Sequence, residues 1–187
     1  MENGKSRVKY GAGRYLILFF ALAFVGWAFE SGYITLRSGK IYNAGFLRMP
    51  FCPIYALAML GAYLLIGTPD EGRGLLRGVA NKPLRYALYL FWAFIIPSVA
   101  ELAVGNLFER TIQVTLWTYE GIPLSLKYAS LPVSIAWSGL LFFFMKVGFT
   151  PLKNAIAKIP TGAVYIVLAI LFSFVAVDLY VSVSAIL

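Results

Sequence analysis

The sequence predicts an all-α polytopic membrane protein, because composition, hydropathy and the placement of charge all indicate that class. Of its 187 residues, 60% are hydrophobic and only 13% are charged, and the mean hydropathy is +0.79. Soluble domains are ordinarily about 45–50% apolar and about 25% charged. A chain this short has too little interior to bury so many apolar side chains. The composition therefore argues against a soluble enzyme, a disordered tail and a secreted disulfide scaffold.

Five apolar segments each approach the length of about 20 residues that crosses a bilayer as a helix. Short, mostly basic loops join them, and five such helices could not share one small soluble core. The N-terminal run begins like a signal peptide, but no small-residue cleavage site follows it, so we expect a retained first helix. We expect residues 1–187 to form one transmembrane domain with spans at about 15–36, 51–68, 86–106, 131–148 and 162–187.

The segment 107–130 between the third and fourth expected spans is unusual, because it carries Trp117, Tyr119 and several aliphatic residues among charged ones. One interpretation is an amphipathic segment at the membrane interface, anchored by its aromatic side chains. The other is a partly re-entrant segment that caps a cavity. The sequence alone favours the interfacial interpretation and leaves the re-entrant one open.

The net charge of +8 is spread over the loops and predicts an orientation. With five spans, 11 of the 16 Lys and Arg residues fall on the side of the N-terminus and 5 on the other side. Cytoplasmic loops carry the excess of basic residues. We therefore expect a plasma-membrane protein with its N-terminus in the cytoplasm and its C-terminus outside. The same dispersal argues against binding of nucleic acid, which requires a continuous basic face.

Three carboxylates, those of Glu30, Glu101 and Asp178, lie within apolar segments. Each costs about 2.5–3.5 kcal/mol on insertion scales, so such groups usually face protein or water. They follow the starts of their segments by 15, 15 and 16 residues, which places all three at about 22–24 Å from the cytoplasmic edge at about 1.5 Å per residue. A shared level predicts an acidic, aromatic-lined pocket in the outer half of the membrane. The alternative is that each acid pairs separately with Arg37, Arg48, Arg110 or Lys127, or lies at the headgroup level.

Known catalytic and metal-binding patterns are missing from the sequence. There is no histidine, so Ser-His-Asp and Cys-His groups are excluded. The lone Cys52 can form no internal disulfide, and the usual zinc and haem sites lack their ligands. Gly4-Lys5-Ser6 resembles the end of a phosphate-binding loop but lacks the upstream glycine and strand. We expect no metal and no cofactor, and an enzyme is the less favoured class.

Several motifs carry a resemblance to a known family. The sequence has G-W-A-F-E at 26–30, N-A-G-F-L-R-M-P-F-C-P-I-Y-A at 43–56, W-T-Y at 117–119 and W-S-G at 137–139. These motifs resemble, in order and spacing, those of the CmpB-type "putative ABC-transporter (type IV)" membrane proteins. The resemblance covers roughly residues 20–140. The sequence departs from the family pattern at Ala44, Met49, Ala56 and Thr118, where the family has Arg, Gly, Gly and Asp.

The resemblance implies a permease-like membrane component that works with a separate ATPase subunit or as a homo-oligomer. The leading hypothesis is that the chain binds or translocates a small or amphipathic solute, cations included. Two alternatives remain open: a membrane-embedded enzyme acting on a lipid or isoprenoid, and a structural or regulatory subunit. The candidate residues for contact with the solute are Glu30, Glu101, Trp27, Asn43, Trp117, Tyr119, Tyr55 and Asp178.

Overall fold

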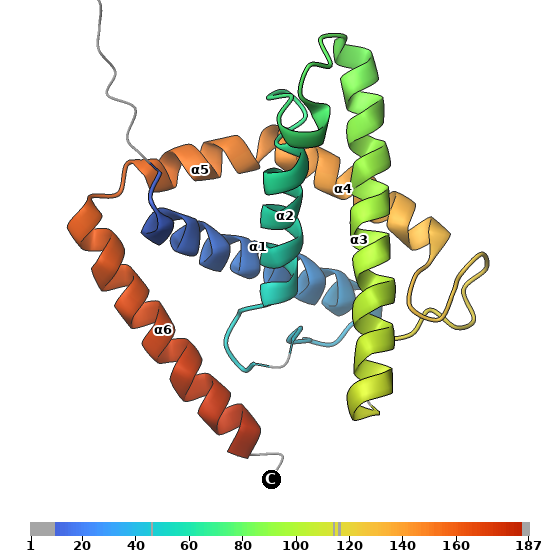
Figure 1. Cartoon of the computed structure of the whole chain (residues 1–187). Helices are drawn as coiled ribbons and strands as arrows, with labels where there is room; N and C mark the ends of the chain where they lie inside the picture. Colours follow the sequence, from blue (N-terminus) through green and yellow to red (C-terminus); the bar gives the residue numbers. More distant parts are fainter. Residues whose placement is uncertain (1–9, 46, 114, 116, 185–187) are drawn as a thin grey trace, which may run out of the picture. The chain divides into compact units, whose positions relative to one another are not determined.

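The computed structural model describes residues 10–45, 47–113, 115 and 117–184. Lys5, Arg7 and Lys9 of the N-terminus, Phe46 of the family motif and residues 185–187 lie outside this part. The described residues form helices and connecting segments with no strand, only an isolated β-bridge between Ser125 and Ser130. This confirms the all-α class. The elements are α1 (Ala12–Ser38), α2 (Pro53–Ile66), the 3-10 turn η1 (Gly74–Leu76), α3 (Lys82–Ile112), α4 (Leu131–Val147), α5 (Phe149–Ala157) and α6 (Thr161–Ser184) (Figure 1).

The chain divides into two compact units, which we describe one at a time. The first unit comprises Met1–Leu60 and Pro151–Leu187 and therefore holds α1, most of α2 and α6. The second unit comprises Gly61–Thr150 and holds the last turn of α2, all of α3 and all of α4.

Fewer helices qualify as membrane spans than the five that the sequence predicts. In the described chain, α1, α3 and α6 are long and apolar enough to cross, and a fourth span results if α4 and α5, bent by 42°, count as one. The expected span 51–68 contains only the 14 residues of α2. A helix of that length covers about 21 Å, short of a hydrocarbon core about 30 Å thick. It is short because it begins at Pro53 and ends before Gly67, whose φ of 74° is left-handed.

Local sequence explains where the long helix α3 begins. The side chain of Asn81 accepts a hydrogen bond from the backbone N–H of Leu84 (3.0 Å), and a proline stands in the first turn. Such caps satisfy N–H groups that have no partner within the helix. The result is a helix of 31 residues, about 46 Å long. It exceeds the hydrocarbon thickness by about 16 Å.

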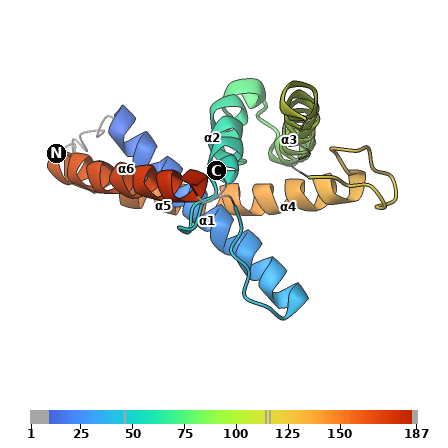
Figure 2. The same cartoon turned by 90° about the horizontal axis from the view of Figure 1, so that it is seen from below.

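In the first unit, α1 and α6 pack together and begin at the same end (Figures 1 and 2). The guanidinium of Arg14 donates a hydrogen bond to the carbonyl of Ile159, just before α6 (2.9 Å). Farther along both helices, the rings of Phe20 and Phe172 meet edge to face at 5.2 Å. Because their starts and their middles pair in the same order, α1 and α6 run parallel.

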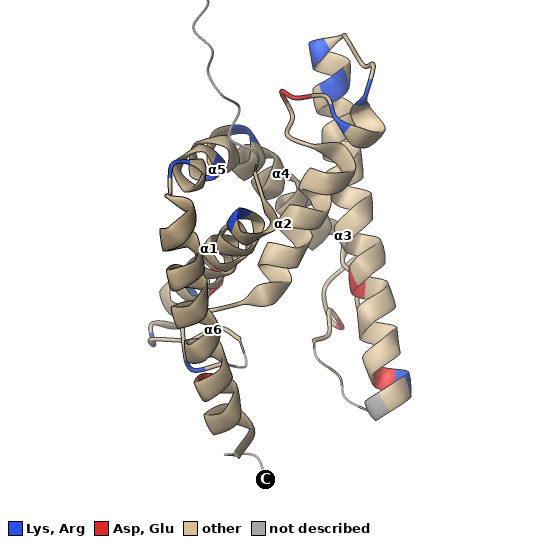
Figure 3. Cartoon of the chain, turned by 60° about the vertical axis from the view of Figure 1, so that its left-hand side comes forward, with Lys and Arg blue, Asp and Glu red and all other residues tan. Residues whose placement is uncertain are grey.

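In the second unit, α3 and α4 pack antiparallel. The hydroxyls of Ser98 and Ser134 are 2.9 Å apart, whereas the ring of Phe142 near the end of α4 lies 5.3 Å from that of Tyr86 near the start of α3. Lys146 stacks over the same Tyr86 ring at 4.5 Å. Basic residues of the connection between α2 and α3 gather at this end, and the acids of α3 lie toward its other end (Figure 3).

Candidate functional site

The connection 39–52 of the first unit lies back along one face of α1. Its residues hydrogen-bond to side chains or carbonyls at four positions of that helix, each four residues from the next. Positions spaced by four lie above one another on a helix. The pairs, loop residue first, are Tyr42 with Thr35, Ala44 with Ser31, Asn43 with Trp27 and Cys52 with Ala23.

Asn43 organises this connection with its side-chain amide. Its oxygen accepts a hydrogen bond from the indole N–H of Trp27. Its nitrogen donates to the carbonyls of Leu47 (3.2 Å) and Arg48 (3.1 Å). The amide therefore ties α1 to a turn several residues farther along the chain, which explains why the motif combines this Trp and this Asn. Ala44, at the position where the family has Arg, is fully buried.

Glu30 and Asp178 both bind the short stretch that precedes α2. The backbone N–H of Met49 donates to Oδ2 of Asp178 at 2.8 Å. The thiol of Cys52 donates to Oε2 of Glu30 at 3.8 Å, a normal separation for a sulfur donor. Two of the three acids in apolar helices are thus bound to a single segment of four residues. Ser182, one turn after Asp178, is buried, and its hydroxyl has no hydrogen-bond partner in the described chain.

Tyr55 begins the close contact between α2 and α1. A side chain at Gly26 would overlap the Cβ and ring of Tyr55. Glycine at position 26 therefore lets the start of α2 approach the backbone of α1. This contact gives the glycine of the G-W-A-F-E motif a packing role.

In the second unit, the segment 117–130, which we call the return segment, folds back against α3. The hydroxyl of Tyr119 hydrogen-bonds to the carboxylate of Glu101. The indole N–H of Trp117 donates to the carbonyl of Tyr128 (3.3 Å), and the two rings meet edge to face at 6.4 Å. A side chain at Gly105 would overlap Tyr128. The segment therefore lies back along α3 from Gly105 to Glu101, which fits both the interfacial and the re-entrant interpretation.

A second polar contact holds the return segment nearer the end of α3. Glu109 accepts hydrogen bonds from the ammonium group of Lys127 and from the hydroxyl of Tyr128 (2.6 Å). The hydrogen bond to Glu109 raises the pKa of Lys127 above its ordinary value, and the one to Tyr128 adds to this. The ion pair is partly exposed, with about two fifths of each side chain accessible.

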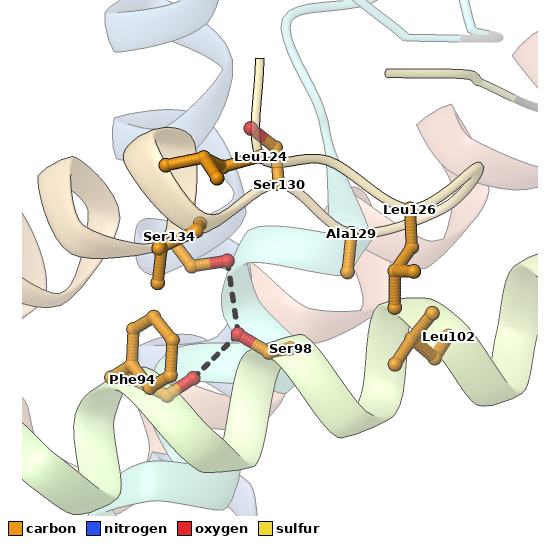
Figure 4. A pocket seen from close by; sticks show the side chains of 9 residues that line it. Phe94, Ser98, Leu102, Leu124, Leu126, Ala129, Ser130 and Ser134 are labelled. Atoms are coloured by element: carbon orange, nitrogen blue, oxygen red, sulfur yellow. Dashed lines mark hydrogen bonds between the residues drawn. The ribbon is translucent and has the colours of Figure 1, made fainter. Parts of the chain in front are cut away.

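Between α3, the return segment and α4 lies a hollow of about 200 Å³ (Figure 4). Its polar lining atoms belong to serines, and the hydroxyl of Ser98 donates to the carbonyl of Phe94 at 2.7 Å. That leaves Ser134 to donate to Ser98, 2.9 Å away. The lining residues are Phe94, Ser98, Leu102, Leu124, Leu126, Ala129, Ser130, Leu131 and Ser134.

None of the three acids in apolar helices is paired with a basic residue in the described chain. The ion pairs found there join Arg73 to Glu71, Lys82 to Asp70 and Lys127 to Glu109. The three acids instead accept hydrogen bonds from neutral groups: a thiol, a backbone N–H and a phenol hydroxyl. These donors hold the carboxylates in place without cancelling their charge.

The candidate residues fall into two groups. Glu30, Trp27, Asn43, Tyr55 and Asp178 surround the connection 39–52, and Glu101, Tyr119 and Trp117 line the return segment. A site shared by Glu30 and Glu101 stays a prediction. Sequence reasoning missed Ser98, Ser134 and Tyr128. Hydroxyls within apolar helices are a weak signal for the two serines, and nothing in the pattern singles out the tyrosine.

These features define a helical membrane protein with carboxylates left uncompensated in its apolar helices. Within the described residues, no three Cys, Asp or Glu side chains cluster as metal ligands. The model of the family described as "Putative ABC-transporter type IV" matches residues 17–183. The chain therefore belongs to this family, which confirms the resemblance read from its motifs. No curated protein and no solved structure matches the chain.

Proposed function

We propose that the protein is a permease-like membrane component that binds a small or amphipathic cationic solute at Glu101 and works with a separate ATPase subunit. The observation that carries this proposal is the neutral partner of the carboxylate, because Tyr119 orients Glu101 without cancelling its charge. A charge in an apolar helix is costly and is usually retained for a substrate, ion or proton.

The surroundings of Glu101 suit a cation. The return segment supplies Tyr119, which bonds to Glu101, and Trp117, two residues before it, whereas the ring of Tyr128 is already covered by Lys127 (5.3 Å). Aromatic faces attract cations by about 0.5–2 kcal/mol, most strongly where water is excluded. Lys127, the nearest candidate competitor in the return segment, is engaged by Glu109. A cationic solute would therefore meet a carboxylate that has no cationic partner in the described chain, with the aromatic side chain of Tyr119 bonded to it.

The binding test uses the full chain in lipid nanodiscs, with tetraphenylphosphonium as the cationic probe and tetraphenylborate as its anionic counterpart. We expect the cation to raise the unfolding temperature, because a ligand that binds only the folded state stabilises it. Glu101→Gln should abolish this shift and keep the fold. Glu120→Gln, at an exposed acid of the return segment, is the matched control and should keep the shift. Loss of stability in Glu101→Gln with no probe effect in the wild type would indicate a structural subunit instead.

A second measurement separates a permease from an enzyme. The purified chain is incubated with extracted membrane lipids, and products are sought by mass spectrometry. We expect no turnover, because transport by this class requires ATP hydrolysis in another subunit. Product formation by the isolated chain would contradict the permease proposal.

Five crossings and a cytoplasmic N-terminus are part of the proposal; the distribution of basic residues supports the orientation, and contacts inside each unit bear on the number of crossings. Because α1 and α6 run parallel, the total number of crossings must be odd, which fits three or five spans and does not fit four. In the second unit, the ring of Tyr63 in the last turn of α2 lies 4.5 Å from that of Phe149, just beyond α4. The end of α2 and the end of α4 thus share one level, as alternating crossings require.

The orientation can be tested with single cysteines in a Cys52→Ala background. We expect Gly78→Cys, in the basic connection between α2 and α3, to react with an impermeant maleimide only after cells are opened. Glu120→Cys should react in intact cells. Equal reactivity of both positions in intact cells would show that an odd number of crossings does not separate them.

A further inference from the structure

We infer that the hollow between α3 and the return segment holds an acyl chain of a membrane lipid. The inference rests on the proposed function, because it identifies the amphipathic solute of the Glu101 site as a molecule with a long aliphatic chain. Glu101 is the neighbour of Leu102, which lines the hollow (Figure 4). A headgroup at Glu101 and a chain in the hollow would belong to one ligand.

The hollow lies at a depth where the surrounding solvent is hydrocarbon. Phe94, Ser98 and Leu102 fall in the middle and second half of the apolar stretch 86–106. Leu124 and Leu126 reach the same level, about 15 Å back from the end of α3 at about 1.5 Å per residue. Their side chains are 77% and 64% exposed. Exposed leucines at this depth are expected to meet lipid tails.

The backbone of the return segment is suited to this depth. Irregular backbone is tolerated in the hydrocarbon region only where its polar groups are satisfied within the protein. The N–H of Leu126 donates to the carbonyl of Ala129 (2.7 Å), and that of Leu131 donates to the carbonyl of Leu124 (3.1 Å). The N–H of Tyr119 donates to the carbonyl of Lys127 (2.9 Å). These bonds tie the segment to itself and to the start of α4, and they leave Leu124 and Leu126 at the exposed rim of the hollow.

Water is a poor occupant of the hollow. A buried water needs two to four polar partners, but the hydroxyls of Ser98 and Ser134 are engaged with each other and with the carbonyl of Phe94. The hydroxyl of Ser130 has no hydrogen-bond partner among the described residues, but it points away from Ser98, so a water in the hollow would find few polar partners together (Figure 4). An empty hollow would forfeit the dispersion contacts of its lining. An aliphatic chain from the adjacent bilayer supplies those contacts and needs no polar partner.

Along α3, an apolar stretch is followed by charged groups toward the end of the helix, in the same order as the acyl chain and the headgroup of a lipid. The apolar hollow spans residues 94–102 of the helix, Glu101 precedes its last lining residue there, and Glu109 follows two turns later with Lys127 and Tyr128. A lipid aligned with its neighbours would place its chain deep and its headgroup toward the end of α3. This order of apolar and polar groups would let a lipid enter the hollow sideways from one leaflet, with its headgroup toward the end of α3.

The test uses the full chain in phosphatidylglycerol nanodiscs with a small fraction of phosphatidylethanolamine that carries a diazirine in one acyl chain. After irradiation, labelled positions are mapped by peptide mass spectrometry. We expect labelling of 98–102 and 124–129 well above that of the lipid-exposed face of α6, where contacts with lipid are transient. Ala129→Leu projects into the hollow and should remove most of this labelling. Ala103→Leu, the same change at an exposed position of α3, should leave it unchanged.

Leu126→Phe narrows the hollow from its exposed rim, and we expect it to lower the labelling as well. It replaces Ala129→Leu in the test if that variant fails to fold. The inference would be overturned if the hollow were labelled no more strongly than α6, or if Ala129→Leu and Leu126→Phe left the labelling unchanged. In that case the proposed cation site at Glu101 would still be judged by the tetraphenylphosphonium result. Labelling that persists in Glu101→Gln, while tetraphenylphosphonium never stabilises the wild type, would instead retain the chain site and reject the cation site.

Discussion

The two units differ in how an irregular segment is held against a long apolar helix. Each has a long apolar helix followed by an irregular segment whose described residues lie back against it: those of 39–52 against α1, and 117–130 against α3. In the first unit the segment is closed, because the side-chain amide of Asn43 is satisfied by three partners and Ala44 is fully buried. In the second unit the segment is held at Glu101 and Glu109, and a hollow remains beside residues 94–102 of α3.

The difference indicates which segment can change its contacts. The connection 39–52 is bonded to α1 at four helix positions, so we expect it to rearrange only at a high cost, because several hydrogen bonds must break together. The return segment is fixed by side-chain contacts at its edges and by hydrogen bonds within itself. We therefore expect substitutions in the first unit to act mainly on stability, and those in the second unit to act mainly on ligand binding.

The largest effect is expected from Gly26→Ala. The added Cβ would overlap Tyr55, and since Tyr55 belongs to a helix its backbone cannot move away alone. Overpacking of this kind costs about 3 kcal/mol of the free energy of unfolding, which SDS titration in mixed micelles can measure. Gly32→Ala, at a glycine of α1 with open space beside it, is the control. It should be neutral or stabilising by up to about 1 kcal/mol because alanine favours a helix.

Gly105→Ala is the counterpart of Gly26→Ala in the second unit, and it tests whether the return segment is the more easily displaced of the two segments. Its Cβ would overlap Tyr128, but Tyr128 belongs to the return segment, which can shift as a whole. We expect a loss of about 1 kcal/mol and a reduced response to tetraphenylphosphonium. A loss equal to that of Gly26→Ala would show that the return segment is as rigid as the connection 39–52, and the comparison would fail.

Asn43→Ala should have an intermediate effect on stability. It removes the acceptor of the Trp27 indole and the donors to two backbone carbonyls, and it leaves these groups to find other partners. A loss of about 1–2 kcal/mol is expected, measured by the same titration. Asn154→Ala, at an exposed position of α5, should change little. An unchanged midpoint in Asn43→Ala would mean that the amide does not hold the segment.

Hydropathy was sufficient to predict the long helices but not their ends. The predicted segments 15–36, 86–106 and 162–187 correspond to α1, α3 and α6, each of which qualifies as a span. The segment 51–68 became a short helix because proline and a left-handed glycine set its limits. The chain also bends by 42° after α4, where Gly148 follows the last helical residue. Apolar character continues through such breaks, so hydropathy alone does not reveal them.

The sequence was sufficient to select the candidate residues by their chemistry, but not to predict which groups they contact. The rarity of acids in apolar helices was enough to select Glu30, Glu101 and Asp178, and the motif was enough to select Trp27 and Asn43. Their partners are set by tertiary contacts. Met49 offers a backbone N–H to Asp178, and every residue except proline carries such a group. The hollow likewise depends on how far the return segment reaches along α3, which composition does not determine.

The smallest effect is expected at the polar edge of the return segment, where Lys127 meets Glu109. The pair is partly exposed, so salt should screen it strongly. The pKa of Lys127 is raised by its hydrogen bonds, so its contribution to stability is complete below the ordinary lysine value of 10.5 and is lost as the pH rises through the raised value. The difference in unfolding temperature between wild type and Lys127→Gln should therefore be small and constant from about pH 6 to about pH 9, with Lys158→Gln, at an exposed position, as the control. A difference that collapses near neutral pH would indicate that Lys127 is buried when the segment is closed against the membrane, and the second unit would then resemble the first.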